Sequence, residues 1–230
     1  SDTLSGGSGN DTYVFGTASM AEVDLVTEGT NQGTDTLVFE SLTTGVTLNL
    51  TKSIVQNVHT NRTLQLNSGS TFENIIGGSG DDILTGNLLN NSFTGGAGSD
   101  TLSGGSGNDT YVFGTASSAE ADSVLEGTNN GTDTLSFASL ATGVTLNLTK
   151  SIVQNIHTNR TLQLNSGSVF ENIVGGSGND VLTGNLLDNS FTGNAGNDTM
   201  TGASGNDTYV FGPASSAEAD SVLEGTNNGT

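Results

Sequence analysis

The sequence is poor in residue types on which several classes of protein depend. It has no cysteine and 1 proline among 230 residues, so disulfides do not hold the fold together. No apolar run approaches the ~20 residues of a transmembrane helix, and the first residues are not a basic, apolar signal peptide. Lys and Arg number 4 against 24 Asp and Glu, a net charge of −20, which argues against nucleic-acid partners and membrane insertion.

Residue patterns that would indicate an enzyme are missing as well. The sequence contains no G-x-S-x-G turn, no H-E-x-x-H motif and no cysteine nucleophile. His59 and His157 are one position in two copies of a repeat, and we interpret them as surface or turn residues. The basic residues form two pairs, Lys52 with Arg62 and Lys150 with Arg160. We interpret these pairs as charge balance; the alternative is a docking point for an acidic neighbouring chain. The sequence predicts a non-enzymatic protein.

Glycine is abundant, at 34 of 230 residues, and it recurs in register with apolar residues. Residues 77–112 read GGSGDDILT, GNLLNNSFT, GGAGSDTLS and GGSGNDTYV. Three of these four words fit GGxGxDxUx, in which U is a large apolar residue. Residues 175–210 read GGSGNDVLT, GNLLDNSFT, GNAGNDTMT and GASGNDTYV. Nonapeptides of this kind are typical of calcium-binding β-helical repeats.

A second repeat, 98 residues long, contains the nonapeptides. Residues 1–98 and 99–196 differ at only 15 positions, and a third copy begins at residue 197. We therefore expect repeat units at 1–98 and 99–196, the start of a third at 197–230, and regular arrays at 77–112 and 175–210. Both ends fall inside a nonapeptide, so we expect one continuous solenoid that is cut from a longer chain.

Each unit is expected to consist of short strands. Apolar pulses in the second unit centre on Leu102, Tyr111, Val124, Leu135, Leu146, Gln154, Leu162, Ile173, Leu182 and Phe191. They predict ten strands, or about five two-strand turns for each 98-residue unit. Residues 149–158 are the only helical candidate, but their Val and Ile favour strand. The predicted fold class is all-β: a calcium-stabilised parallel β-roll, which is a two-sided β-solenoid.

The turn of each nonapeptide has the chemistry of a site for a hard cation. In a two-sided roll each word spends six residues turning and three as a strand, so loops two words apart lie next to each other along one edge. Gly77–Asp82 should therefore stack on Gly95–Asp100, and Gly86–Asn91 on Gly104–Asp109. Calcium takes roughly six to eight oxygen ligands, which two aspartates and several backbone carbonyls can supply. Glycine lets the backbone take positive φ and bring its carbonyls close to the ion.

The nonapeptides resemble those of the repeats-in-toxin family of secreted bacterial proteins, and so do the phrases ENIIGG at 73–78 and NDTYVF at 108–113. The resemblance implies that calcium is held between alternate loops by position six and by the carbonyls of positions one and three. Position six falls on Asp11, Asp82, Asp100, Asp109, Asp180, Asp198 and Asp207, and on Asp2 at the start of the chain. The implied carbonyl ligands are Gly77, Ser79, Gly95, Ala97, Gly104, Ser106, Gly175, Ser177, Gly193, Ala195, Gly202 and Ser204.

Several positions depart from the pattern. Asn91 and Asn189 replace the position-six aspartate, so their edges should bind calcium more weakly or through amide oxygens. Asn194 and Ala203 replace glycines at position two, which should degrade the later array. The weaker metal ligands that we expect are Asp2, Asn91, Asn189, Asp24, Asp35, Asp122, Asp133 and Asp220. Glu28, Glu126 and Glu224 are weaker still.

Three functions are compatible with these features. The first is a calcium-binding structural segment of a secreted or cell-surface bacterial protein, such as an adhesin stalk, an extracellular fibre or a surface layer. Such a segment would fold on binding calcium and self-assemble into fibres or layers. The alternative is the non-catalytic C-terminal region of an enzyme or toxin that leaves the cell by type I secretion, as the resemblance implies. A third reading is a carbohydrate- or ice-binding face, suggested by Thr-rich strands. All three predict an extracellular or cell-surface location.

Overall fold

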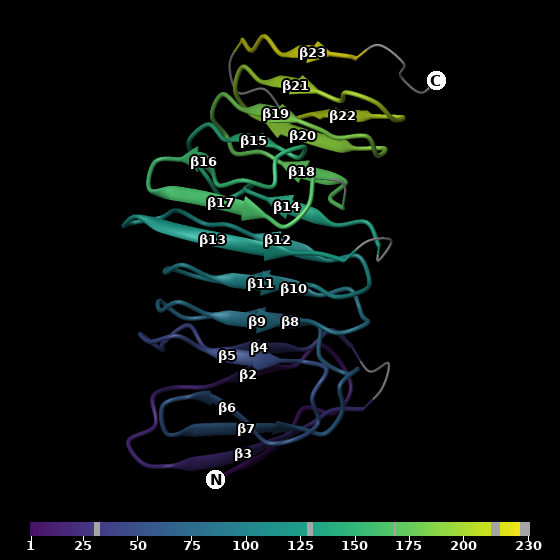
Figure 1. Ribbon diagram of the computed structural model, residues 1–230. Helices are drawn as coiled ribbons and strands as arrows, with labels where there is room; N and C mark the ends of the chain where they lie inside the picture. The colour runs from purple at the N-terminus through teal and green to yellow at the C-terminus, as the bar shows by residue number, and fades with distance from the viewer. Residues whose placement is uncertain (30–32, 128–130, 168, 213–216, 226–230) are drawn as a thin grey trace. The chain divides into compact units, whose positions relative to one another are not determined.

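The computed structural model in Figure 1 describes residues 1–29, 33–127, 131–167, 169–212 and 217–225. Part of the third repeat copy, expected at 197–230, lies outside these residues. The described residues form strands joined by turns, and none of them is helical. The described residues therefore include no helix that is long and apolar enough to cross a membrane. The chain divides into two compact units, Ser1–Asp109 and Thr110–Thr230.

Short strands of the first unit form two faces. Strands β2, β4, β8 and β10 form one face, and the other face holds two sheets, ordered β1-β3-β7-β6 and β5-β9-β11. Successive strands alternate between the faces except from β5 to β7. The strands are β1 (Thr3–Ser5), β2 (Thr12–Val14), β3 (Glu22–Thr27), β4 (Thr36–Val38), β5 (Thr47–Asn49), β6 (Gln56–His59), β7 (Arg62–Leu66), β8 (Asn74–Ile76), β9 (Ile83–Thr85), β10 (Ser92–Thr94) and β11 (Thr101–Ser103).

The second unit repeats this organisation. One face is ordered β12-β14-β18-β20-β22, and the other holds β13-β17-β16 and β15-β19-β21-β23. Its strands are β12 (Thr110–Val112), β13 (Glu120–Leu125), β14 (Thr134–Ser136), β15 (Thr145–Asn147), β16 (Gln154–His157), β17 (Arg160–Leu164), β18 (Asn172–Val174), β19 (Val181–Thr183), β20 (Ser190–Asn194), β21 (Thr199–Thr201), β22 (Thr208–Phe211) and β23 (Ser221–Leu223). Leu102 lies in β11, and the other nine apolar pulses named from the sequence lie in strands β12 to β20. Residues 154–157 of the helical candidate are strand β16.

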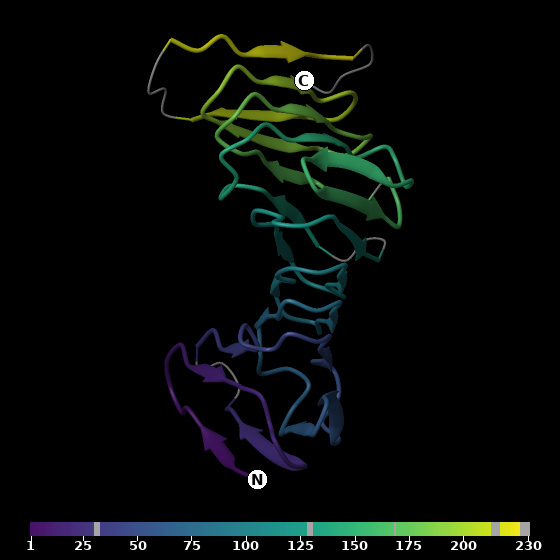
Figure 2. The same ribbon diagram turned by 90° about the vertical axis from the view of Figure 1, so that its left-hand side faces the viewer.

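The core of the roll is a ladder of position-eight side chains. Parallel pairing places Leu102 beside Leu84 and Phe93 beside Ile75, and all four side chains are buried. Figure 2 shows the strands around residues 77–109 on opposite sides of a narrow coil. Burying a side chain of this size stabilises a fold by roughly 1.5–3 kcal/mol, and here the burial depends on the neighbouring rungs. The parallel β-roll predicted from the sequence is confirmed.

One segment departs from the predicted two-strand turns. Strand β16 pairs antiparallel with β17, and β6 pairs in the same way with β7. The two-residue turns between these strands end in Asn159 and Asn61, whose φ values of 67° and 61° suit a tight hairpin. As a result β15, β16 and β17 all lie on one face between β14 and β18, and strict alternation between the faces is wrong here.

The extra hairpin interrupts the sheet on its face. In the second unit the sheet that includes β17 ends at β16, and a separate sheet begins at β15. The side chain of Gln154 bridges the two, since its Oε1 accepts from Asn147 N at 3.0 Å and its Nε2 donates to Asn147 O at 2.9 Å. Gln56 and Asn49 make the same two bonds in the first unit, at 3.0 and 2.9 Å. One primary amide thus replaces a strand-to-strand ladder.

Candidate metal centre

The turns of the nonapeptides stack two words apart, as predicted. Asp82 N donates to Asp100 Oδ1 at 2.9 Å, which joins Gly77–Asp82 to Gly95–Asp100. On the opposite edge, Asn91 N donates to Asp109 Oδ1 at 2.7 Å. The second array repeats both contacts, from Asp180 N to Asp198 Oδ1 at 2.9 Å and from Asn189 N to Asp207 Oδ1 at 2.8 Å. The position-six side chain therefore reaches the position-six N–H of the loop on which it stacks.

Glycine at position one leaves the space in which these oxygens gather. A Cβ on Gly77 would collide with Asp82 Oδ2 and with the carbonyl oxygen of Gly95. A Cβ on Gly95 would likewise collide with the carboxylate of Asp100. The same collision with a position-six aspartate recurs at Gly6, Gly175, Gly193 and Gly202. Carboxylate and carbonyl oxygens from two loops thus converge on one small volume, and this is the donor set that calcium prefers.

Positive φ is confined to particular positions of the loops. Gly96, Gly98, Gly105 and Gly107, at positions two and four, have φ between 104° and 111°. The position-three residues stack beside them: Ala97 N donates to Gly78 O at 3.2 Å, and Ser106 N to Asn87 O at 3.0 Å. In the second array Ser204 N donates to Asn185 O at 3.3 Å, and Ser177 N to Leu140 O at 2.8 Å. The edge is built mainly from backbone, and glycine is the residue that takes positive φ there without strain.

The position-six carboxylates are buried in a way that disfavours their charge. Asp82 and Asp180 are fully buried. Burial, opposed by hydrogen bonds from backbone N–H groups, raises the pKa of Asp82 to about 6 and that of Asp180 to about 7. Burial also raises the pKa values of Asp198 and Asp207. The buried Oδ2 atoms of Asp11 and Asp207 have no hydrogen-bond partner. A divalent cation would neutralise these groups and occupy their free lone pairs.

Asparagine at position six uses its amide differently. Asn91 Oδ1 accepts from Asn87 N at 2.8 Å, and Asn91 Nδ2 donates to Glu73 O at 2.9 Å. Asn189 repeats this, with Oδ1 on Asn185 N at 2.8 Å and Nδ2 on Glu171 O at 3.0 Å. The NH₂ group faces a carbonyl that would otherwise face an ion. Direct hydrogen bonds therefore close these two loops in the ion-free fold, and weaker calcium binding at Asn91 and Asn189 stays a prediction.

The departures at position two of the second array also have structural consequences. Asn194 has φ 65°, and its Nδ2 donates to Gly175 O at 2.8 Å. Gly175 O is one of the carbonyls expected to bind calcium, so the amide competes with an ion for it. Ala203 has φ 76°, a region that costs a residue with a Cβ roughly 1–2 kcal/mol. Asn194 therefore affects the second array through a donor that competes with calcium, and Ala203 affects it through backbone strain.

Among the weaker ligands, Asp35 and Asp220 extend the stacked edges. Asp11 N donates to Asp35 Oδ1 at 2.9 Å, and Asp198 N donates to Asp220 Oδ1 at 2.9 Å, which copies the contact between regular loops. Asp2 N reaches Asp24 Oδ1 at 2.9 Å in the same manner. Asp133, the counterpart of Asp35, is buried. These acids therefore belong to the same edges as the regular words.

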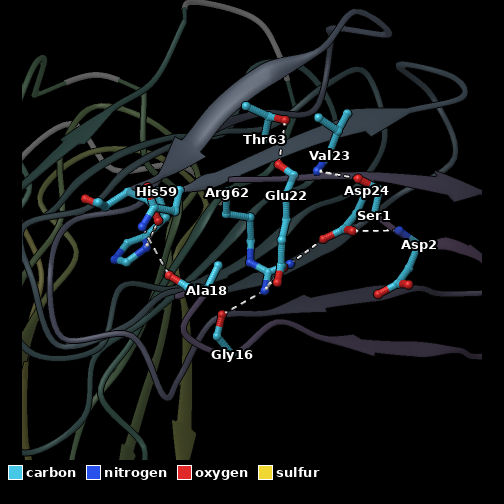
Figure 3. A network of polar contacts seen from close by, with 12 residues as sticks. Ser1, Asp2, Gly16, Ala18, Glu22, Val23, Asp24, His59, Arg62 and Thr63 are labelled. Atoms are coloured by element: carbon cyan, nitrogen blue, oxygen red, sulfur yellow. Dashed lines mark hydrogen bonds and ion pairs between the residues drawn. The ribbon is translucent and has the colours of Figure 1, made fainter. Parts of the chain in front are cut away.

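Asp24 and Asp122 already have a cation. Figure 3 shows the guanidinium of Arg62 between Asp24, Glu22 and Gly16. Arg62 pairs with Asp24 through Nη1, and its Nη2 lies 2.9 Å from Glu22 Oε2 and 3.0 Å from Gly16 O. In the second unit Arg160 pairs with Asp122 and Glu120, and its Nη2 donates to Gly114 O at 3.2 Å. Arginine thus takes one oxygen of Asp24 and one of Asp122, and calcium binding by these two acids stays a prediction.

The same geometry corrects the interpretation of the basic residues. Arg62 and Arg160 are 7% and 3% exposed and pair with acids, so they balance charge inside the fold and are not a docking point for a neighbouring chain. Each guanidinium also lies over a phenylalanine ring, Arg62 at 5.5 Å from the Phe15 centroid and Arg160 at 5.3 Å from that of Phe113. They are the cationic centres of buried clusters. Lys52 and Lys150 are exposed.

Sequence reasoning missed two acids at position six. Glu73 Oε2 accepts from Asp35 N at 2.8 Å, and Glu171 Oε2 accepts from Asp133 N at 2.8 Å. Burial and the neighbouring Asp35 raise the pKa of Glu73, while a hydrogen bond from the Asp35 N–H opposes the shift. The available signal was the spacing, because Glu73 lies nine residues before Asp82 and is position six of residues 68–76. A longer side chain and the absence of glycine at the start of that word concealed it.

Comparison with known proteins agrees with this arrangement. The family model described as RTX calcium-binding nonapeptide repeat (4 copies) matches residues 1–17, 68–88, 76–111, 170–186 and 174–209. A comparison with curated proteins gives no match. The stacked loops fit calcium in donor type, burial and unsatisfied oxygens, and proteins with these repeats are in general secreted by bacteria. The chain is thus a calcium-binding repeat segment of the secreted bacterial type, and its nonapeptide arrays match the model of the repeats-in-toxin family.

Proposed function

We propose that calcium binds between alternate loops and that the chain folds as these sites fill. The proposed ligands are the position-six aspartates from Asp11 to Asp207, the position-one and position-three carbonyls named above, and the edge acids Asp2, Asp35, Asp133 and Asp220. The buried, raised-pKa carboxylates Asp82 and Asp180 support this, because they disfavour the ion-free fold at neutral pH. An ion that binds only the folded chain stabilises it by mass action.

We propose further that the folded segment has a structural role in a protein outside the cell, as a stalk, fibre or surface layer. The observation that carries this proposal is the 98-residue repeat, in which only 15 positions differ while both copies keep the same strands and stacked loops. Tandem copies of one rod-forming unit suit a spacer, in which length matters more than a unique site. The open strand edges of a roll also favour self-association.

Electron microscopy with circular dichroism tests the proposal. The purified chain is examined in millimolar-range calcium and after chelation. We expect strand-rich dichroism and filaments or sheets that form only with calcium. Identical strand-rich spectra with and without chelator would refute coupled folding. Dispersed short rods in calcium would refute self-assembly by this segment.

The second candidate is the non-catalytic C-terminal region of a type I-secreted enzyme or toxin. It is favoured by the family match over the nonapeptide arrays, because such arrays assist export and folding in that setting. Short rods in calcium, together with a catalytic domain elsewhere in the same polypeptide, would favour this function. Further 98-residue copies in that polypeptide would favour the structural one.

A further inference from the structure

Three apolar side chains of the first unit are exposed where the chain turns. Ile54 and Val55 follow strand β5 and are 66% and 49% exposed, and Leu88, in the turn after β9, is 75% exposed. Turns usually carry Gly, Pro, Asn, Asp or Ser, so leucine, isoleucine and valine are unusual there. Lys52, which is also exposed, precedes Ile54 by two residues. We call these four residues the Lys52 patch.

The members of the Lys52 patch lie on one edge of the roll. Strands β5 and β9 pair in parallel, so the chain leaves both strands at the same edge. There the carbonyl oxygen of Thr51 packs against Gly69, and Asn87 Nδ2 donates to Phe72 O at 2.8 Å, so both segments contact the turn between β7 and β8. The patch residues adjoin Thr51 and Asn87 in the sequence and therefore share this edge.

The second repeat copy keeps the same exposed group. Its members there are Lys150, Ile152, Val153 and Leu186, and the three apolar ones are between 57% and 76% exposed. By contrast, the exposed Met20 and Val23 of the first copy are replaced by Ser118 and Ala121 in the second. A group of exposed apolar residues with a polar rim is typical of a contact surface. Retention of the whole group in both copies favours this interpretation.

Lys52 gives the patch a positive charge on a chain whose net charge is −20. The ion pairs identified among the described residues involve the buried Arg62 or Arg160 and neither lysine. Lys52 and Lys150 are therefore the exposed members among the 4 Lys and Arg residues of the chain. A surface that complements the patch in charge is acidic, and the surface of a second copy of this chain meets that requirement.

Two exposed acids lie on the opposite edge of the same unit. Glu40 lies in the turn after β4 and Asp81 in the turn after β8, and both are exposed. The two turns stack, because Ser79 N donates to Leu42 O at 2.9 Å. The turn after β8 leads to β9 on the other face, and the patch lies where the chain leaves β9, one strand further on. We call Glu40 and Asp81 the acidic edge.

We propose that the Lys52 patch of one chain binds the acidic edge of a second copy, so that rolls lie side by side. Contact of the patch with itself would place lysine against lysine, whereas this contact pairs opposite charges. The two surfaces differ and lie on opposite edges, so the contact does not close on itself and builds an open sheet of chains. The inference rests on the proposed self-association, and it adds a sideways contact to the association through open strand edges.

The size of the patch indicates a weak contact. Three apolar side chains bury much less than the roughly 800 Å² per partner of a stable protein interface. The second unit presents the same apolar group, but its opposite edge has Ala138 and Asn179 in place of the two acids. It therefore adds apolar contact without opposite charges. Two weak contacts in one chain strengthen binding together, since the second forms within an existing complex.

Carbodiimide coupling in calcium tests the contact, because this reagent joins a lysine directly to a carboxylate that touches it. Lys52 and Lys150 are the two lysines of the chain, so the cross-linked peptides are easy to assign. We expect covalent dimers in which Lys52 is joined to Glu40 or Asp81 of the other chain. No coupled dimer, or dimers joined through Lys150 as often as through Lys52, would overturn the proposal.

Charge reversal gives a second test by sedimentation in calcium. Lys52→Glu should weaken association at least tenfold, and Lys150→Glu is the matched control, which should weaken it much less because its opposite edge is uncharged. Glu40→Lys/Asp81→Asn reverses the charge of the acidic edge and uses the residue that the second copy has at 179. Mixed with Lys52→Glu, it should restore association. Equal losses from the two lysine variants, or no restoration in the mixture, would refute the pairing.

Circular dichroism and electron microscopy of the same samples separate this inference from the proposed function. Lys52 is exposed, so Lys52→Glu should keep the calcium-dependent, strand-rich spectrum. Its micrographs should show single rods or filaments where the parent chain forms sheets. Sheets formed by Lys52→Glu as readily as by the parent would overturn this inference alone. A parent chain whose spectrum does not respond to calcium would instead refute the proposed calcium-dependent folding.

Discussion

The nonapeptide arrays and the irregular segments between them bury the same kind of group and neutralise it differently. In the arrays, Asp82 and Asp100 meet in a cradle of carbonyls that fits a free divalent ion. In the irregular segment, Asp24 and Glu22 meet beside the carbonyl of Gly16, and Arg62 fills that cradle. One cation exchanges with the solvent, whereas the other is part of the chain. Stability therefore depends on calcium concentration in one region and on sequence alone in the other.

The largest expected effect comes from removing the built-in cation. Arg160→Gln should destabilise the chain by about 3–5 kcal/mol, because it leaves Asp122 and Glu120 buried without their partner. The loss should be the same at every calcium concentration above saturation. Urea unfolding in calcium measures it, with Lys150→Gln, an exposed lysine of the same copy, as control. Equal urea midpoints for the two variants would contradict the idea that Arg160 neutralises the acids beside it independently of calcium.

The second effect concerns pH in the absence of calcium. Burial raises the pKa values of Asp82 and Asp180 to about 6 and about 7, above the unfolded value of 3.8. The folded state then binds more protons than the unfolded state between pH about 4 and about 7, so the stability of calcium-free protein should fall as the pH rises through this window. Calcium binds the deprotonated acids, so its presence should reverse the trend. Thermal unfolding measures how stability changes with pH in metal-stripped and in calcium-loaded protein. Equal pH dependence in the two would count against Asp82 and Asp180 as calcium-binding acids.

Removing one aspartate from an array should give a smaller loss. Asp100→Ala deletes the carboxylate that reaches Asp82 N, and we expect calcium affinity at that edge to fall about tenfold, or ~1.4 kcal/mol. Calorimetric titration measures the change. Asp188→Ala is the matched control, because Asp188 is an exposed position-five acid whose counterpart is Asn90. Equal losses from both variants would refute the importance of position six.

A fourth variant replaces the asparagine that closes a loop by the aspartate found at position six of the other loops. Asn91→Asp removes the amide donated to Glu73 O and places a carboxylate there. We expect the variant to hold one more calcium ion than the parent and to be less stable than the parent after chelation. Ion counting by native mass spectrometry with paired melting curves tests this. A variant with an unchanged count would mean that the amide is not what excludes the ion.

The smallest effect should come from strain in the second array. Ala203→Gly relieves the strain of a residue with φ 76° and should stabilise the calcium-loaded chain by about 0.5–1 kcal/mol. The strain that is relieved exceeds the cost of the extra conformational entropy that glycine gives the unfolded state. Ala195→Gly is the control; Ala195 is not among the residues with positive φ, so the change should destabilise the chain slightly. Melting temperatures in saturating calcium compare the two. A loss of stability in both would show that Ala203 is not strained.

Features that repeat in register could be predicted from the sequence. The loop that ends at Asp82 and the loop that ends at Asp100 stack as expected, because the nine-residue period fixes strand and turn together. Position-eight residues such as Leu84 and Phe93 are buried for the same reason. The strands of the irregular segment were also located, since alternation of apolar residues marks each strand.

Contacts between segments of unequal length could not be predicted. Arg62 meets Asp24 across 38 residues, and Glu28 meets Tyr13 across 15, and neither spacing is a multiple of nine. The antiparallel pairing of β6 with β7 depends on Asn61 accepting positive φ, which composition does not reveal. Glu73 does keep the nine-residue spacing, but its word lacks the glycine with which each word of the regular arrays begins. Periodicity thus located the edges, and side-chain chemistry decided how each was neutralised.

The amide bridge of Gln154 has a mechanical consequence. On one face of the second unit, β14 and β18 are joined by a parallel ladder of backbone hydrogen bonds. On the other face, β16 and β15 belong to separate sheets, and the side chain of Gln154 supplies bonds between them. At this level one face is held by a backbone ladder, and the side-chain amide of Gln154 contributes to holding the other. Gln56 marks the equivalent point in the first unit, so in each repeat a single side-chain substitution would loosen one face and leave the ladder on the other in place.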